Sequence, residues 1–171
     1  MRFLTAVALA AVMLWVPVDG VAQEETRIGE FYYVPNIDEF DDTDRGTIHV
    51  LADDPDEGRE PMLYWACMRD GLNVVLYFDQ YYAGDEDDDI LVRYRFDQTP
   101  ASDQEYWPLL NSDAEAAYIP MSRVSTFSMQ ALMASRVVME ATDPFDGESH
   151  RFRFSLDGLE AASRKLPCWG W

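Results

Sequence analysis

Histidine and cysteine are scarce in this chain, and their scarcity removes whole classes of protein. The 171 residues include two histidines and two cysteines, which lie far apart in the sequence. Structural zinc and iron–sulfur sites need several closely spaced thiolates or imidazoles, so these patterns are excluded. We therefore expect no metal centre and no other cofactor.

Positive charge is also scarce. Lysine and arginine together number 13, against 32 aspartates and glutamates, and the formal net charge is −19. Binding to nucleic acid depends on cationic side chains that displace counterions from phosphates. A nucleic-acid partner is excluded on this ground.

Signatures of catalysis are missing as well. The sequence contains no G-x-S-x-G, no H-E-x-x-H and no glycine-rich phosphate loop. We assign no catalytic residue and do not expect an enzyme. A small hydrolase that uses two carboxylates stays open as an alternative, because acidic residues are so abundant.

The first 22 residues are typical of a secretory signal peptide. Arg2 precedes an apolar run over residues 3–18, and small residues follow at 20–22. The run is shorter than the roughly 20 residues that a membrane-spanning helix needs. We predict a signal peptide over 1–22, a single exported β-rich domain over 23–171, a periplasmic or secreted location in a bacterium, and no stable membrane span after cleavage. An uncleaved membrane anchor is the alternative.

Export changes how the two cysteines are interpreted. Cys67 and Cys168 form the only possible pair, and an exported chain enters an oxidising compartment. We predict a disulfide between them, which would close a loop of about 100 residues and contribute roughly 4–5 kcal/mol in the chain-entropy account. The alternative is two buried free thiols.

Most of the chain has the pattern of short antiparallel strands. Apolar and polar residues alternate over 90–96 and 151–156, as in strands with one buried face. Asp70-Gly71 predicts a hairpin turn between strand-like segments. The strands expected besides these two are 31–34, 47–51, 62–68, 72–78, 116–119 and 136–142.

Two helices complete the expected fold. Residues 122–135 carry an apolar stripe that includes Phe127, Met129 and Met133. Asp157 is expected to cap a final short helix, with Glu160 as its capping-box partner. The sequence therefore predicts an α+β domain: a mostly antiparallel β-sandwich or curved sheet with two short helices and one disulfide.

Two Arg-x-Arg steps stand on the outward faces of predicted strands. Arg93 and Arg95 lie on one strand, and Arg151 and Arg153 lie on another. If the strands pair, four guanidinium groups share one sheet face and could bind a carboxylate or a phosphate. The interpretation we favour is that the chain's own acidic residues neutralise them, or that their stems pack over the sheet.

Aromatic residues near turns and at the C-terminus form a second candidate surface. Rings on loops can stack on sugars or anchor a protein partner, although most aromatic side chains serve the core. We expect Trp169 and Trp171 to be the better candidates, because a chain terminus is rarely buried. The other aromatic candidates are Tyr81, Tyr82, Tyr106 and Trp107.

Two acidic clusters offer the oxygen ligands that calcium prefers. They cover residues 38–44 and 85–89. Neither has the ligand spacing of an EF-hand loop. We interpret them as solvated loops, and calcium binding stays open.

A set of spaced residues gives the chain a family resemblance. A strand ends in Cys67, an apolar strand follows it, and the chain closes on Cys168-Trp169. Between these ends lie the segments 92–97 (VRYRFD), Pro100, Trp107, a helix face from Phe127 to Leu132, and Phe152-x-Phe154-x-Leu156-x-Gly158-Leu159.

This pattern, over about residues 28–169, is similar to type VI secretion-associated proteins of the VasI/TagO kind and to related exported bacterial and phage proteins. The resemblance implies a periplasmic accessory protein with no catalytic residues to carry over. The acidic segment 84–89 and the Trp171 tail depart from the pattern.

The sequence thus predicts an exported, non-enzymatic accessory or binding protein with a protein partner in the cell envelope. The first alternative is a module that binds cell-wall or other glycans through loop aromatics. The second is the small carboxylate-dependent hydrolase.

Overall fold

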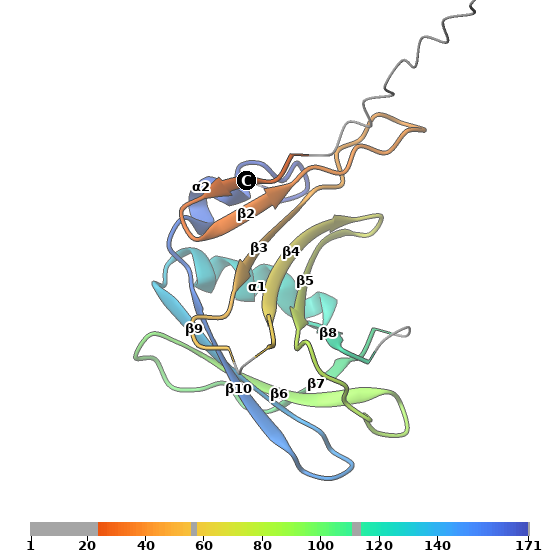
Figure 1. Cartoon of the computed structure of the whole chain (residues 1–171), viewed down its shortest axis with the longest axis vertical. Coiled ribbons are helices and arrows are strands. Elements are labelled where there is room, and N and C mark those ends of the chain that lie inside the picture. Colours follow the sequence, from red (N-terminus) through yellow and green to blue (C-terminus); the bar gives the residue numbers. More distant parts are fainter. Residues whose placement is uncertain (1–23, 56–57, 111–113, 171) are drawn as a thin grey trace, which may run out of the picture.

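The computed structural model describes residues 24–55, 58–110 and 114–170 of the chain. The predicted signal peptide and Trp171 lie outside these described residues. Within them, the chain folds into two antiparallel sheets and two short helices (Figure 1). The predicted fold class is confirmed.

The larger sheet has six strands in the order β1-β2-β3-β4-β5-β8. Its strands are Thr26–Ile28 (β1), Phe31–Val34 (β2), Thr47–Leu51 (β3), Met62–Met68 (β4), Gly71–Tyr77 (β5) and Ala116–Tyr118 (β8). The expected hairpin joins β4 to β5, where Met68 pairs with Gly71 and Gly71 adopts a φ of 118°. Glycine fits this turn because other residues rarely adopt a positive φ.

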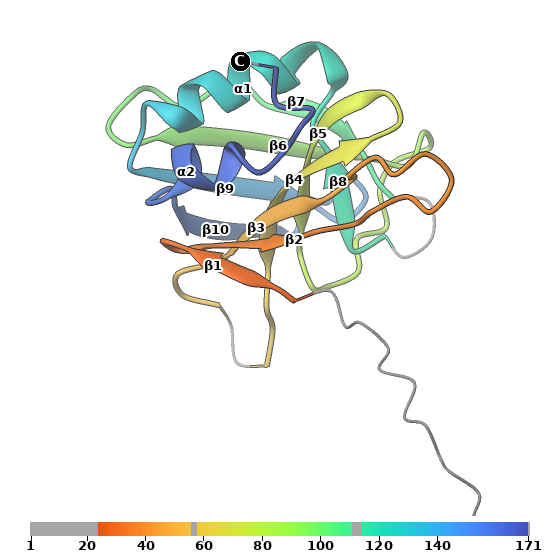
Figure 2. The same ribbon diagram turned by 90° about the horizontal axis from the view of Figure 1, so that it is seen from above.

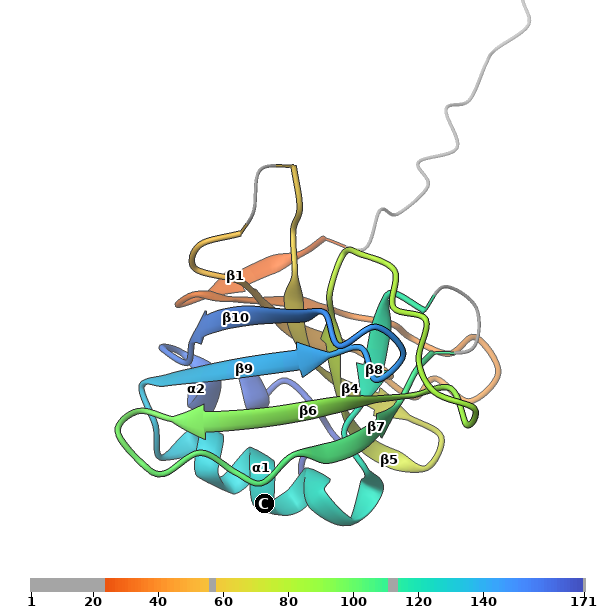
Figure 3. The same cartoon turned by 90° about the horizontal axis from the view of Figure 1, so that it is seen from below.

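The smaller sheet has four strands in the order β10-β9-β6-β7. They are Asp89–Phe96 (β6), Glu105–Pro108 (β7), Arg136–Thr142 (β9) and Ser149–Ser155 (β10). Figure 3 shows its strands crossing those of the larger sheet at a steep angle. The sheets meet where Leu109 bridges to Ala117, and where the Asp53 amide donates to the carbonyl of Arg153.

Helix α1 (Met121–Leu132) closes one open side of the sandwich (Figure 2). Its Phe127 ring contacts Trp65 of the larger sheet and both Tyr94 and Phe96 of the smaller one. The helix therefore joins the inner faces of both sheets. The second helix, α2 (Leu159–Ser163), packs on β1 and β2.

Trp65 of β4 lies at the centre of the core. It is fully buried, and its ring centroid lies 5.9 Å from that of Phe31 and 6.1 Å from those of Phe127 and Trp169. Its indole N–H donates to the Ser128 hydroxyl at 3.0 Å. A buried serine on α1 is therefore tolerated because it satisfies a buried donor.

The predicted disulfide is confirmed. Cys67 on β4 is bonded to Cys168, with 5.6 Å between the two Cα atoms. The bond spans 101 residues and holds the C-terminal segment against the larger sheet. This attachment brings the neighbouring Trp169 to the core.

Two helix details differ from expectation. The Met129 and Met133 side chains are exposed, because the buried face of α1 is formed instead by Val124, Phe127, Ser128 and Ala131. The predicted capping box at α2 is wrong. The N-cap is Gly158, with a φ of 93° and no side-chain cap.

Tertiary packing explains the cap. A Cβ atom at Gly158 would lie 2.6 Å from the Ile28 carbonyl oxygen, so only glycine fits against the end of β1. The carbonyl of Asp157 meanwhile accepts a hydrogen bond from the Glu30 amide. Long-range contacts with the β1–β2 turn therefore override the local capping signal.

Two strands were not among those expected: β1, which pairs with β2, and β7, which pairs with β6. Among the described residues, the helices are all too short or too polar to cross a membrane.

Candidate functional site

The four candidate arginines gather on the outer face of the smaller sheet. Alternation along β6 buries Ile90, Val92, Tyr94 and Phe96 and turns the Arg93 and Arg95 side chains outward. Alternation along β10 turns Arg151 and Arg153 outward in the same way.

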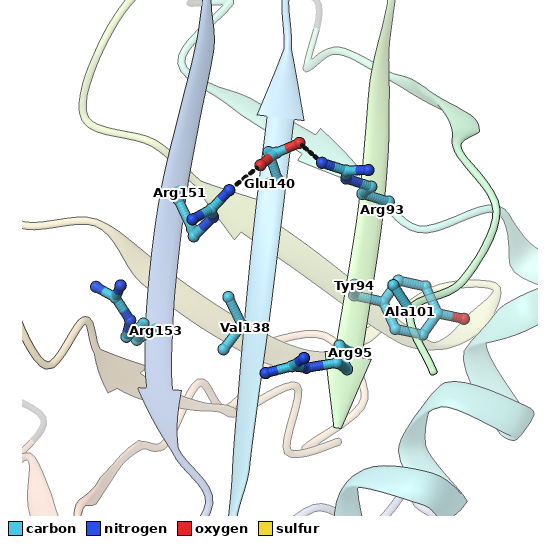
Figure 4. A pocket seen from close by; sticks show the side chains of 8 residues that line it. All are labelled: Arg93, Tyr94, Arg95, Ala101, Val138, Glu140, Arg151 and Arg153. Atoms are coloured by element: carbon cyan, nitrogen blue, oxygen red, sulfur yellow. Dashed lines mark hydrogen bonds and ion pairs between the residues drawn. The ribbon is translucent and has the colours of Figure 1, made fainter. Parts of the chain in front are cut away.

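The two arginine strands do not pair directly, because β9 lies between them. Two rows of opposed residues therefore cross the sheet (Figure 4). The first row is Arg93, Glu140 and Arg151, and the second row is Arg95, Val138 and Arg153. We call these six residues the arginine face.

Glu140 neutralises the first row. Its carboxylate accepts from the Arg93 guanidinium at 2.5 Å and from that of Arg151 at 2.6 Å. The hydrogen bond from Arg151, followed by the contact with Arg93, outweighs burial and lowers the pKa of Glu140 below its ordinary value of 4.5. Internal neutralisation is therefore confirmed for two of the four arginines.

The second row lacks such a partner. Among the described residues, no carboxylate oxygen lies within 4.0 Å of the Arg95 or Arg153 guanidinium. Asp97, just beyond β6, accepts hydrogen bonds from the backbone amides of Ser135 and Arg136. Two guanidinium groups therefore stand on this face without a counter-ion from the part of the chain that the structure describes.

A shallow groove runs over the arginine face. It encloses about 390 Å³, and its walls include Tyr94 and Ala101 beside the six residues of the two rows. This volume is near the lower end of small-ligand sites, which span about 300–1,000 Å³. With four arginines and one glutamate, the groove is locally positive in a chain of net charge −19. It is suited to bind an anionic group.

Sequence reasoning found the arginines but missed Glu140 and Val138. Both lie on the outward face of β9, a strand that the sequence does predict. Alternation along a strand shows which way a side chain points, but not which strand lies beside it. Glu140 could have been proposed as a partner only if the strand order had been known.

Two of the candidate tryptophans are core residues. Trp107 is 0% exposed and Trp169 is 5% exposed. The expectation that Trp169 is accessible at the chain end is therefore wrong, and Trp107 serves the core as most aromatic side chains do. Trp107 packs inward from β7, and the disulfide draws Trp169 into the core. Tyr82 is also buried, whereas Tyr81 and Tyr106 are exposed. Trp171 lies outside the described residues.

The acidic clusters mostly serve their own loops. The Arg45 guanidinium pairs with both Asp38 and Asp41. The Asp85 carboxylate accepts from the backbone amides of Asp87 and Asp89. Partial burial, together with the neighbouring carboxylates, raises the pKa of Asp89.

Metal-binding chemistry gains no support from these loops. In the part of the chain that the structure describes, no three or more histidine, cysteine, aspartate or glutamate side chains gather as they would around a metal ion.

No protein-family model and no curated protein matches the sequence of this chain. Among solved structures, the fold is similar to that of invasion associated protein B from Bartonella henselae, with a TM-score of 0.58 and 13% sequence identity. The match covers 84% of this chain and 95% of that chain. This likeness shows a shared fold and nothing finer.

Proposed function

We propose that this protein is an exported, non-enzymatic accessory protein that binds an acidic segment of a protein partner through its arginine face. One observation carries the proposal: four arginines line one groove on the exposed sheet face, and among the described residues Glu140 is the one carboxylate in that lining. Acidic residues outnumber basic ones 32 to 13 in the sequence, so local neutralisation would have been easy. Surplus arginine at such a site favours a ligand that supplies the missing negative charge.

The disulfide supports the exported part of the proposal. Such bonds persist in oxidising compartments and are rare in the cytosol. Cys67 is buried and bonded to Cys168, which packs against the core, so the bond is structural. It accords with the signal-peptide pattern of residues 1–22. We expect the protein recovered from its producing cells to begin at Gln23 and to contain no free thiol, and a cytoplasmic form with both thiols free would contradict export.

The binding part is tested by partner capture from the cell envelope. We expect the wild-type protein to retain a defined envelope protein, and the Arg95→Glu/Arg153→Glu double variant to lose it. Arg69→Glu, on the β4–β5 turn, is the matched control and should retain the partner. A partner held equally by the double variant would place the binding surface elsewhere and overturn the proposal.

The cellular setting follows from the family resemblance. We propose that the protein acts in type VI secretion, as proteins of the VasI/TagO kind do. The proposal is based on the spaced residues that give the chain its resemblance to them. Deleting the gene should then reduce type VI-dependent secretion. Unchanged secretion would remove this setting and leave the anion-binding proposal to its own test.

The two alternatives are less well supported. A glycan module was expected to use loop aromatics; of those candidates Trp107 and Trp169 are core residues, while Tyr81 and Tyr106 are exposed. No arrangement among the described residues favours the carboxylate-dependent hydrolase.

A further inference from the structure

The two rows of the arginine face are alike at their ends and differ at their centres. Each has one arginine on β6 and one on β10, and the residue between them belongs to β9. In the first row that central residue is Glu140, which binds both of its neighbours. In the second row it is Val138, which has no charge to offer.

Strand geometry gives the two rows the same spacing between their arginines. Neighbouring strands lie about 4.8 Å apart, so the two arginine Cα atoms of a row are separated by about 10 Å. The two rows are separated by two residues along each strand, so they lie about 7 Å apart. A carboxylate above Val138 would therefore meet the Arg95 and Arg153 side chains much as the Glu140 carboxylate meets those of the first row.

We infer that the second row binds a single carboxylate group from an acidic segment of the partner protein, seated over Val138 between Arg95 and Arg153. This inference rests on the proposed function and specifies where on the arginine face the ligand binds. In the first row, the Glu140 carboxylate occupies the position that the partner's carboxylate takes in the second row. The first row shows what the second row becomes when its carboxylate is supplied from outside.

The chemistry of the pair favours a carboxylate. Guanidinium is planar and can form paired hydrogen bonds with a carboxylate. In the first row each guanidinium contacts one oxygen of Glu140, so a single carboxylate bridges two arginines. The Val138 side chain gives the site an apolar floor against which the methylene stem of a glutamate or aspartate can pack. In Figure 4, Arg95 extends towards β9 beside Val138, while the head of Arg153 lies on the far side of β10. Arg153 must therefore turn inward when the ligand binds.

The charge of the whole chain favours a short acidic segment over an extended polyanion. A net charge of −19 repels nucleic acid or a strongly anionic surface that spans much of the molecule. Charges further away than the Debye length of about 8 Å are largely screened at physiological salt. One or two carboxylates at the groove thus meet the local positive charge and little of the distant negative charge.

Calorimetric titration of the full mature protein tests the inference directly. The probe is a synthetic peptide with two adjacent glutamates flanked by glycine and serine, and the matched peptide with two glutamines is its control. We expect the glutamate peptide to bind and the glutamine peptide not to bind. Arg95→Gln and Arg153→Gln should each weaken binding about tenfold, because each removes a charged hydrogen-bond donor.

The decisive variant supplies the missing carboxylate from the chain itself. Val138→Glu should build a second copy of the first row, weaken peptide binding more than tenfold and leave the melting temperature equal or higher. Val138→Gln introduces a side chain of nearly the same size as that in Val138→Glu but without its charge. This variant should bind the peptide with an affinity within about threefold of wild type. Equal losses in the two variants would mean that bulk alone blocks the groove, and would overturn the inference.

The remaining outcomes separate this inference from the proposed function. If Arg93→Gln and Arg151→Gln weaken peptide binding as strongly as the second-row variants, the ligand is not seated at the second row, although the arginine face still binds it. If the glutamate peptide fails to bind while the envelope partner is still captured through Arg95 and Arg153, the carboxylate inference fails and the proposed function stands. If neither peptide nor partner depends on these arginines, both fail.

Discussion

The cluster around Trp65 and the arginine face differ in whether their polar groups have partners within the chain. In the Trp65 cluster, the buried indole N–H has its partner in Ser128, and the disulfide fixes the tail that brings Trp169 into contact. On the arginine face, two of four guanidinium groups have no carboxylate partner among the described residues.

This difference distinguishes polar groups that stabilise the fold from polar groups that are available to bind a ligand. A buried donor without a partner costs stability, so Ser128 stabilises the fold. An exposed guanidinium is solvated and costs little, so the surplus on the arginine face persists without helping the fold. Changes in the Trp65 cluster should therefore alter stability and spare binding, and changes on the arginine face should do the reverse.

The largest effect is expected on removing the disulfide. Cys67→Ala/Cys168→Ala should lower the free energy of unfolding by about 4–5 kcal/mol, because an open chain gains entropy on unfolding that a closed loop lacks. Urea denaturation of the oxidised wild type and the variant measures the loss. Binding of the glutamate peptide should persist wherever the variant is still folded. A loss below about 1 kcal/mol would show that the tail is held mainly by packing.

A smaller loss is expected where the C-terminal segment passes β1. Gly158→Ala should cost about 2–4 kcal/mol, because it places a Cβ against the Ile28 carbonyl at a positive φ. Gly147→Ala is the matched control: its φ of 78° is also positive, but nothing lies within 4 Å of the added Cβ. The control should lose only about 1–2 kcal/mol for the backbone strain. Equal shifts in melting temperature would contradict the close approach at Gly158.

Ser128→Ala tests the hydrogen bond inside the Trp65 cluster. It leaves the buried Trp65 N–H without its partner and should cost about 1–3 kcal/mol. Ser125→Ala, on the exposed side of the same helix, should change stability by less than about 0.5 kcal/mol. Thermal melts of the two variants make the comparison, and an unaffected Ser128→Ala protein would show that this bond does not stabilise the core.

The smallest change in stability is expected at Glu140. The pKa of its carboxyl is lowered in the folded state, so its contribution is present above the ordinary value of 4.5 and is lost as the pH falls through the folded pKa. The partner arginines are about half exposed, at 46% and 56%, so Glu140→Gln should cost less than about 1 kcal/mol at neutral pH.

The same substitution should also flatten the acid limb of the stability curve and strengthen binding of the glutamate peptide, because it frees Arg93 and Arg151. Melts across the acid range, paired with calorimetry, measure both effects. Weaker peptide binding in Glu140→Gln would mean that Glu140 helps to place the ligand instead of competing with it.

Local patterns were enough to predict most strands and the direction of the arginines. The bounds of β4 and β9 agree with the sequence expectation, and alternation placed Arg93 and Arg95 outward on β6. Strand order was not available from the same pattern, because alternation is a property of one strand and pairing joins segments far apart in the chain. The neutralising Glu140 was missed for this reason.

The error over Trp169 has a different cause. A position near the chain end suggests exposure, since termini are rarely tied down. The predicted disulfide already implied otherwise, because Cys168 had to reach the strand that carries Cys67, and Trp169 is its neighbour. The covalent bond to Cys67 fixes the position of this segment and outweighs the tendency of a chain end to be exposed.

The arginine side-chain resonances report most directly on the central claim. Each Nε–H group of the folded, oxidised protein can be followed by NMR while the glutamate peptide is added. The account predicts that the Arg95 and Arg153 signals and the Val138 methyl signals move most, while the signals of Arg93 and Arg151 move little because Glu140 already holds them. Movement that is larger in the first row, or absent from both rows, would contradict it.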